Sequence, residues 1–157
     1  MEQVTIKPFK LIGLSIRTSN SNGQAAQEIG ALWNTFLGTQ IPQQIPNKLS
    51  EEVYSLYTDY DGDHTQPYTV VLGCPVENLD NIPEGLVGRT FEGGNYVRLS
   101  AKGALADGIV VNKWMEIWEA EKQGKLNRAY TADFEVFGAK AQNPSDAEVD
   151  FLIAIHT

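Results

Sequence analysis

The chain has 157 residues, of which 42% are apolar and 20% charged, a composition typical of a globular protein with a sizeable core. Its formal charge of −8 argues against nucleic acid as a direct partner, because an acidic surface repels phosphate groups. The single cysteine excludes an internal disulfide framework, and no run reaches the ~20 apolar residues of a membrane helix, so no membrane partner is expected.

The first half predicts four strands and one helix. The first ten residues lack the apolar core of a signal peptide, which favours a cytoplasmic protein. Apolar residues recur at helical spacing from Ala25 through Trp33, and Gly38 is placed to end that helix. Cys74 lies in an apolar run and is expected in the core. The predicted elements are strands over 4–6 and 9–17, a helix over 24–38, and strands over 52–60 and 68–77.

The second half predicts the same kinds of element in the same order. Its helix carries a second apolar stripe that includes Trp114 and Trp118, and Gly124 is placed to stop it. The predicted elements are strands over 87–91 and 96–101, a helix over 108–123, and strands over 134–138 and 148–155.

The two halves look like an internal repeat. A displacement of about eighty residues places Trp33 on Trp114, Tyr54 on Glu135, and the middle of the strand at 68–77 on the last strand. One displacement that aligns a helix and two strands is more than chance matching of apolar residues.

The repeat predicts the architecture. We expect an α+β fold in which residues 1–157 form a single domain, with repeat halves of about 1–80 and 84–157. Each half would be a βαββ unit with antiparallel strands and one main helix, and the two units would be related by a pseudo-two-fold axis. Because pockets favour interfaces between packed units, a ligand cleft is expected between them.

Motifs for metal or nucleotide chemistry are incomplete. The run 59–63 resembles a calcium loop, but Val70 stands where an EF-hand needs glutamate. His64 and His156 lack the partners of a zinc motif, and no nucleophile elbow or phosphate loop is present. We therefore predict no metal and no cofactor.

Glu135 is the most informative single residue, because it interrupts an otherwise apolar strand. Strand alternation places its side chain on the face of Phe137. A carboxylate between aromatic rings attracts cations through its charge and through the ring quadrupoles. A solvated edge glutamate explains the pattern equally well. Trp33, Trp114 and Trp118 likewise fit either a core or the walls of a pocket.

The chain resembles the GyrI-like small-molecule-binding domains, which also occur as effector-binding domains of AraC- and MerR-type transcription regulators. The resemblance covers nearly the whole chain, and the order and spacing of its motifs carry it. These are LWNTF at 32–36, YSLYTDY at 54–60, YTVVLGCPV at 68–76, GNYV at 94–97, Trp118, DFEVFG at 133–138 and the last strand at 149–155.

The resemblance implies an aromatic cleft between the two units with a strand glutamate at its base. That glutamate falls on Glu135, and an acidic residue of the last strand falls on Asp150. An alanine, Ala154, stands where the family often has a proline. The expected wall residues are Trp33, Trp118, Trp114, Tyr54, Tyr96 and Phe137.

The implied partner is a small organic ligand, lipophilic and cationic. No helix-turn-helix precedes the domain, so we expect a stand-alone binding protein that senses or sequesters its ligand, with an unidentified regulator protein as a further partner. Two alternatives stay open. Some GyrI-like proteins inhibit DNA gyrase, and some family members are hydrolases, in which a buried glutamate can act as a general base. Fold analogy alone supports the hydrolase reading, so catalysis is not expected.

Overall fold

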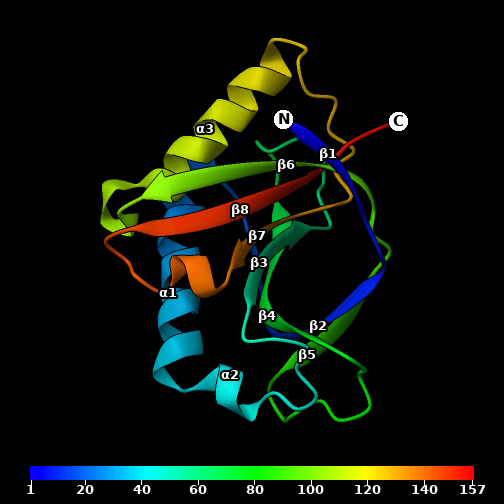
Figure 1. Cartoon of the computed structure of the whole chain (residues 1–157), viewed down its shortest axis with the longest axis vertical. Helices are drawn as coiled ribbons and strands as arrows, with labels where there is room; N and C mark the ends of the chain where they lie inside the picture. The colour runs from blue at the N-terminus through cyan, green and yellow to red at the C-terminus, as the bar shows by residue number, and fades with distance from the viewer.

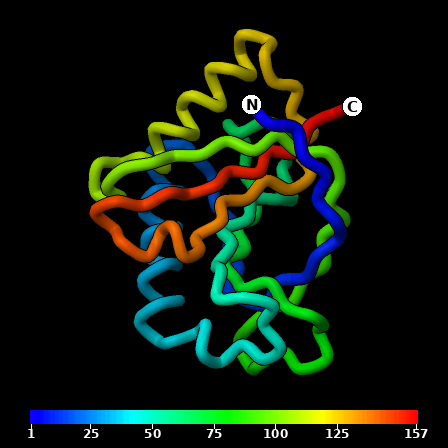
Figure 2. The backbone as a smooth tube through the Cα atoms, viewed as in Figure 1, coloured from blue at the N-terminus to red at the C-terminus, as the bar shows by residue number.

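The apolar runs of the chain form eight strands of one antiparallel sheet in the computed structural model, which describes all 157 residues (Figure 1). The two termini lie at the same end of the molecule (Figure 2). The strands are β1 (Glu2–Ile6), β2 (Phe9–Thr18), β3 (Val53–Thr58), β4 (Tyr68–Val76), β5 (Val87–Phe91), β6 (Gly94–Gly103), β7 (Ala132–Phe137) and β8 (Ala147–Ala154).

Two long helices, α1 (Gln24–Gly38) and α3 (Ile109–Lys122), accompany the sheet, and the predicted α+β class is confirmed. A short helix, α2 (Ile41–Gln44), lies in the segment expected to be a loop, where Pro42 occupies the first turn and needs no intrahelical donor. Single 3-10 turns occur at Ser21–Gly23, Leu105–Asp107 and Ala139–Ala141.

The strand order is β1-β6-β8-β7-β3-β4-β2-β5, which is symmetric about the central pair of β7 and β3. The two halves therefore contribute equivalent strands to one continuous sheet. The first strand of each half crosses to the other half: β1 pairs with β6, and β5 pairs with β2. Gly93 makes the turn before β6 with φ of 74°, and a side chain there would collide with the carbonyl oxygen of Ile6. The halves are thus interlocked at both sheet edges.

Each face of the sheet covers its own core. Helix α1 packs on β2 and β4, and α3 packs on β6, so both helices share one face. The opposite face carries neither long helix, and it buries a second hydrophobic cluster that is rich in aromatic residues. In that cluster Tyr54 stacks on Phe134 with ring centroids 4.9 Å apart, and the ring of Tyr96 meets Phe134 edge-on. Cys74 is buried on the helix face, as expected.

The predicted alignment that places Tyr54 of β3 on Glu135 of β7 is wrong. Tyr54 was aligned with Glu135, yet Tyr54 belongs to the cluster on the face without helices, and Glu135 points to the helix face, where Trp114 contacts it. Because side chains alternate along a strand, an alignment wrong by one residue moves a side chain to the other face. The equivalent position in β3 is therefore filled by a neighbour of Tyr54.

Candidate ligand-binding site

Glu135 lies near the middle of the sheet, on β7. It pairs with Ser55 on β3 and with Phe151 on β8, and its side chain points to the face that carries α1 and α3. Only 2% of the residue is exposed to solvent. The alternation of β7 also places Phe137 on that face, as predicted, where it meets the ring of Trp33 at 4.8 Å.

Two neutral donors hold the carboxylate. Tyr57 Oη donates to Glu135 Oε2 at 2.8 Å, and Trp114 Nε1 donates to the same oxygen at 2.5 Å. Ser55 Oγ donates in turn to Tyr57 Oη at 3.3 Å. Oε1 accepts no hydrogen bond from the protein, and no lysine, arginine or histidine forms an ion pair with Glu135. The protein therefore satisfies half of this carboxylate and supplies no positive charge.

Burial raises the pKa of Glu135 to about 7, because the ionised form loses its hydration. The hydrogen bonds from Trp114 and Tyr57 lower that pKa and only partly offset the loss. The pKa of Tyr57 lies well above its ordinary range, first because of burial and then because of the nearby Glu135 carboxylate, so its hydroxyl stays a donor. Near neutral pH, the Glu135 carboxyl group is therefore present in both its neutral and its ionised form.

Aromatic rings surround this carboxyl group. The rings of Tyr57 and Trp114 meet at 5.3 Å, and Phe151 meets Trp114 edge-on at 5.5 Å. Tyr68 packs against Tyr57 at 5.8 Å. Sequence reasoning missed Tyr57, Tyr68 and Phe151. The alternation within β3 carried the signal, since it places Tyr57 on the face opposite to Tyr54.

The other predicted site residues are not gathered around Glu135. Tyr54 and Tyr96 lie in the core of the opposite face, where Tyr96 Oη donates to the carbonyl of Ala132 at 2.8 Å. Asp150 lies on that face too, paired with Val136, and accepts from Ser100 and Lys140 near the surface. Of the seven predicted residues other than Glu135, Trp114 alone forms a hydrogen bond with its carboxylate.

Trp114 and Tyr57 pack against each other beside Glu135, where a cleft was expected. Trp118, one turn further along α3, is 6.4 Å from Trp114 and stacks on His64 with ring centroids 4.7 Å apart. A surface hollow beside α3 is lined by His64, Trp118 and Glu121, and a second one follows the outer side of the same helix; neither includes Glu135.

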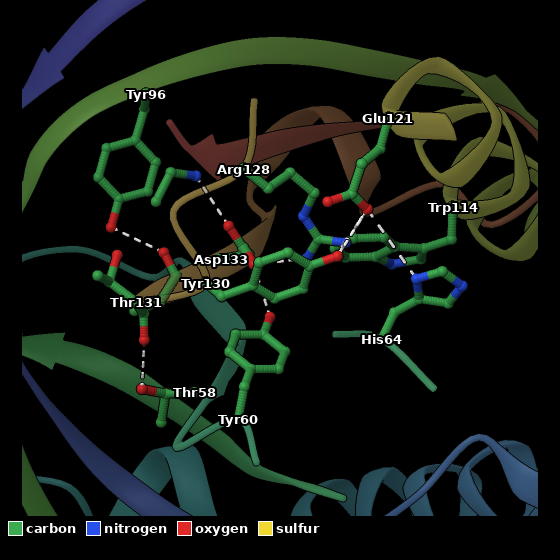
Figure 3. Close-up of polar contacts among 12 residues, drawn as sticks. Thr58, Tyr60, His64, Tyr96, Trp114, Glu121, Arg128, Tyr130, Thr131 and Asp133 are labelled. Atoms are coloured by element: carbon green, nitrogen blue, oxygen red, sulfur yellow. Dashed lines mark hydrogen bonds and ion pairs between the residues drawn. The ribbon is translucent and has the colours of Figure 1, made fainter. Parts of the chain in front are cut away.

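A second buried carboxylate, Asp133, lies two residues before Glu135 and on the same face of β7. Its Oδ2 forms an ion pair with Arg128 Nη2 at 2.7 Å and accepts from Tyr60 Oη at 2.6 Å (Figure 3). Its Oδ1 accepts from the backbone N–H of Ala154 at 2.8 Å. Unlike Glu135, this carboxylate has a cation of its own.

Comparison with known proteins identifies the family. A model of integron-associated effector-binding proteins, Cass2, matches residues 2–155. The chain belongs to this family. The predicted resemblance to GyrI-like effector-binding domains is thereby confirmed. Binding of a small-molecule effector is the function that membership gives.

One relative and two solved structures are similar to this chain. The putative transcriptional regulator protein YobU of Bacillus subtilis (strain 168) is 26% identical over 148 residues, which cover 93% of this chain and 91% of that protein. An integron cassette protein from the mobile metagenome of Vibrio cholerae shares 27% identity and a TM-score of 0.75, with 99% and 95% of the two chains covered. SAV2435, solved bound to tetraphenylphosphonium, shares the fold with a TM-score of 0.80 at 14% identity, with 99% and 93% covered.

Two structural findings concern membrane-spanning helices and metal sites. None of the helices has both the length and the apolar character that crossing a membrane requires. No three acidic, histidine or cysteine side chains come together as metal ligands would.

Proposed function

We propose that this protein is an effector-binding protein that takes a lipophilic organic cation at Glu135, to sense or to sequester it. The observation that carries the proposal is a fully buried carboxylate, ringed by aromatic side chains, whose partners in the protein are all neutral. A relative of the same fold, SAV2435, has been solved with the lipophilic cation tetraphenylphosphonium, which supports this ligand class.

The physical chemistry of the site favours a cation over a neutral molecule. Burying the ionised carboxylate of Glu135 without a partner costs several kcal/mol, and its raised pKa reflects that cost. A cation that enters supplies the missing charge in a medium of low dielectric constant, where the attraction exceeds its value in water. The rings of Tyr57 and Trp114 add the attraction of their faces.

Binding requires Trp114 to move. The indole N–H of Trp114 donates to Glu135 Oε2. A ligand that approaches the carboxylate from the helix side therefore has to displace this hydrogen bond. Trp114 is only partly buried, whereas Tyr57 is enclosed, so the indole is the side chain with room to swing out. We therefore expect ligand binding to change the tryptophan fluorescence, and the Trp114→Phe variant to lose most of that change.

The decisive test is the Glu135→Gln variant with a matched pair of ligands, the cation methyltriphenylphosphonium and the neutral triphenylphosphine oxide. Glutamine keeps the shape and accepts from Tyr57 and Trp114 but carries no charge. The affinity for the cation, measured by calorimetry, should fall by ~2 to 5 kcal/mol, as for other desolvated charge pairs. The affinity for the neutral ligand should change much less. Equal losses for the two ligands, or no loss for either, contradict the proposal.

A further inference from the structure

Arg128 is a cation buried beside the Glu135 site. It lies in the segment between α3 and β7, where its backbone forms an isolated bridge with Ile155, and only 4% of the residue is exposed. Its Nη2 pairs with the fully buried Asp133, and its Nη1 lies 3.7 Å from Glu121 Oε1. Burial alone would lower the pKa of Arg128, but Asp133 together with Tyr60 and Tyr130 more than offsets it, so the guanidinium stays charged.

Aromatic rings complete the surroundings of this guanidinium. Its central carbon lies 4.2 Å from the ring centroid of Tyr130, 5.7 Å from that of Trp114 and 5.9 Å from that of Tyr60. The buried Nε finds no hydrogen-bond acceptor. Ring faces and carboxylates, rather than a full set of acceptors, therefore hold Arg128 (Figure 3). Three rings with two carboxylates are the chemistry that recognises an organic cation.

The cage around Arg128, formed by the rings of Tyr60, Trp114 and Tyr130 and the carboxylates of Glu121 and Asp133, adjoins the Glu135 site. Asp133 and Glu135 point to the same face of β7, about 6.6 Å apart along the strand by ordinary strand geometry. Trp114 is a wall of both places, since its Nε1 binds Glu135 and its ring faces Arg128. The cage reaches the surface through Glu121, which also lines the hollow beside α3.

We infer that Arg128 occupies a second cation subsite as a built-in ligand and thereby restricts the binding site to monocations. The two adjacent carboxylates would otherwise suit a ligand with two positive charges. With Arg128 in place, Asp133 is neutralised and one carboxylate, Glu135, remains for a ligand. A second ligand charge would meet the guanidinium instead. This selectivity rests on the proposed function, whereas the subsite itself does not.

The selectivity is tested with two rigid probes of similar shape, the monocation N-methyl-4-phenylpyridinium and the dication methyl viologen. The wild type should bind the monocation more tightly than the dication. In Arg128→Ala the ratio of dication to monocation affinity should rise at least about tenfold, because Asp133 becomes available to the second charge. An unchanged ratio, or no binding of the dication by Arg128→Ala, overturns the inference.

The subsite is tested separately, with ethylguanidinium as a replacement for the lost side chain. Millimolar ethylguanidinium should raise the melting temperature of Arg128→Ala and leave that of the wild type unchanged. Its neutral analogue ethylurea should do neither. Because Arg128→Ala can prove too unstable to purify, the yield of refolding from urea with each compound provides a second measurement. Equal effects of the two compounds on Arg128→Ala overturn the subsite.

The matched control is Arg128→Ala combined with Asp133→Asn, which leaves the same space without the carboxylate. Both the rise in the ratio of dication to monocation affinity and the ethylguanidinium effect should disappear in this double variant, and their persistence would count against the inference. The two proposals fail in different ways. A wild type that binds no cation contradicts the function proposed for Glu135, and the ethylguanidinium experiment still decides whether the Arg128 cage is a cation subsite.

Discussion

Asp133 and Glu135 are two carboxylates on one strand, on one face and equally buried, but they have opposite kinds of partner. Asp133 has the guanidinium of Arg128 at 2.7 Å, a tyrosine hydroxyl and a backbone N–H. Glu135 has one tyrosine hydroxyl and one indole N–H. The first carboxylate is compensated within the protein and the second is not.

The contrast shows that two equally buried acids can differ in whether the protein compensates their charge. A buried carboxylate with a matched cation forms an ion pair, and removing the cation destabilises the fold because it leaves an uncompensated buried charge. A buried carboxylate with only neutral donors either takes up a proton or attracts a cation from outside. Four predictions test this difference, from the largest expected effect to the smallest.

Removing the cation from Asp133 should have the largest effect. The Arg128→Met variant leaves a buried charge without compensation, so the free energy of unfolding should fall by about 3 to 5 kcal/mol. Urea unfolding at pH 8 measures it. Adding Asp133→Asn to the same variant should recover most of the loss, since a neutral pair replaces the uncompensated charge. A double variant as unstable as Arg128→Met would show that packing, and not charge, holds this region together.

Neutralising Glu135 should have the opposite sign and depend on pH. The pKa of Glu135 is about 7 in the folded protein against 4.5 for an unperturbed glutamate. Between these values the unfolded chain releases a proton that the folded protein keeps, so the wild type loses stability as pH rises through this window. The loss is complete above pH 7 and amounts to roughly 3 kcal/mol.

The Glu135→Gln variant lacks this titration. It should match the wild type near pH 4 and exceed it by up to roughly 3 kcal/mol at pH 8, since glutamine is neutral throughout. Urea unfolding of both proteins at several pH values isolates the difference, because all other titrations cancel. A difference that does not change with pH would mean that Glu135 is not desolvated in the folded protein.

Removing one donor from Glu135 should have a smaller effect. The Tyr57→Phe variant loses a hydrogen bond to the ionised carboxylate, worth roughly 1.5 kcal/mol of stability at pH 8. Because that hydrogen bond lowers the pKa of Glu135, its loss should move the midpoint of the pH dependence upward. Tyr54→Phe is the control, since its hydroxyl, from the same strand, makes no hydrogen bond. Equal effects of the two variants would remove Tyr57 from the site.

Changing Asp150 should have the smallest effect. It lies on the opposite face and pairs with Lys140, whose side chain is 57% exposed. Such surface pairs are worth little, so Asp150→Asn should change the affinity for methyltriphenylphosphonium by less than ~0.5 kcal/mol. Calorimetry alongside Glu135→Gln makes the comparison direct. A loss as large as that of Glu135→Gln would return Asp150 to the binding site.

Much of the fold could be predicted because its signals are local. The apolar spacing and the terminal glycine predicted the helix over 24–38, which are the bounds of α1. The crossing of β1 and β5 to the opposite halves could not be predicted, since the pairing of edge strands is set by contacts remote in sequence. Sequence reasoning placed Tyr54 at the site because it assumed one displacement for the whole repeat, and β3 departs from it.

The sequence by itself determined the approximate positions of the strands and of the two long helices, and that one acidic residue, Glu135, interrupts an apolar strand. It also indicated the family, because the order of motifs survives low identity. Only the tertiary structure decided which partners each buried carboxylate has. Tyr57, which binds Glu135, is 78 residues away in the sequence, and Trp114, which also binds it, is 21 residues away. Arg128, which binds Asp133, lies in an irregular segment that has no periodic pattern. Desolvation and charge compensation depend on such neighbours in space, and local propensity carries no information about them.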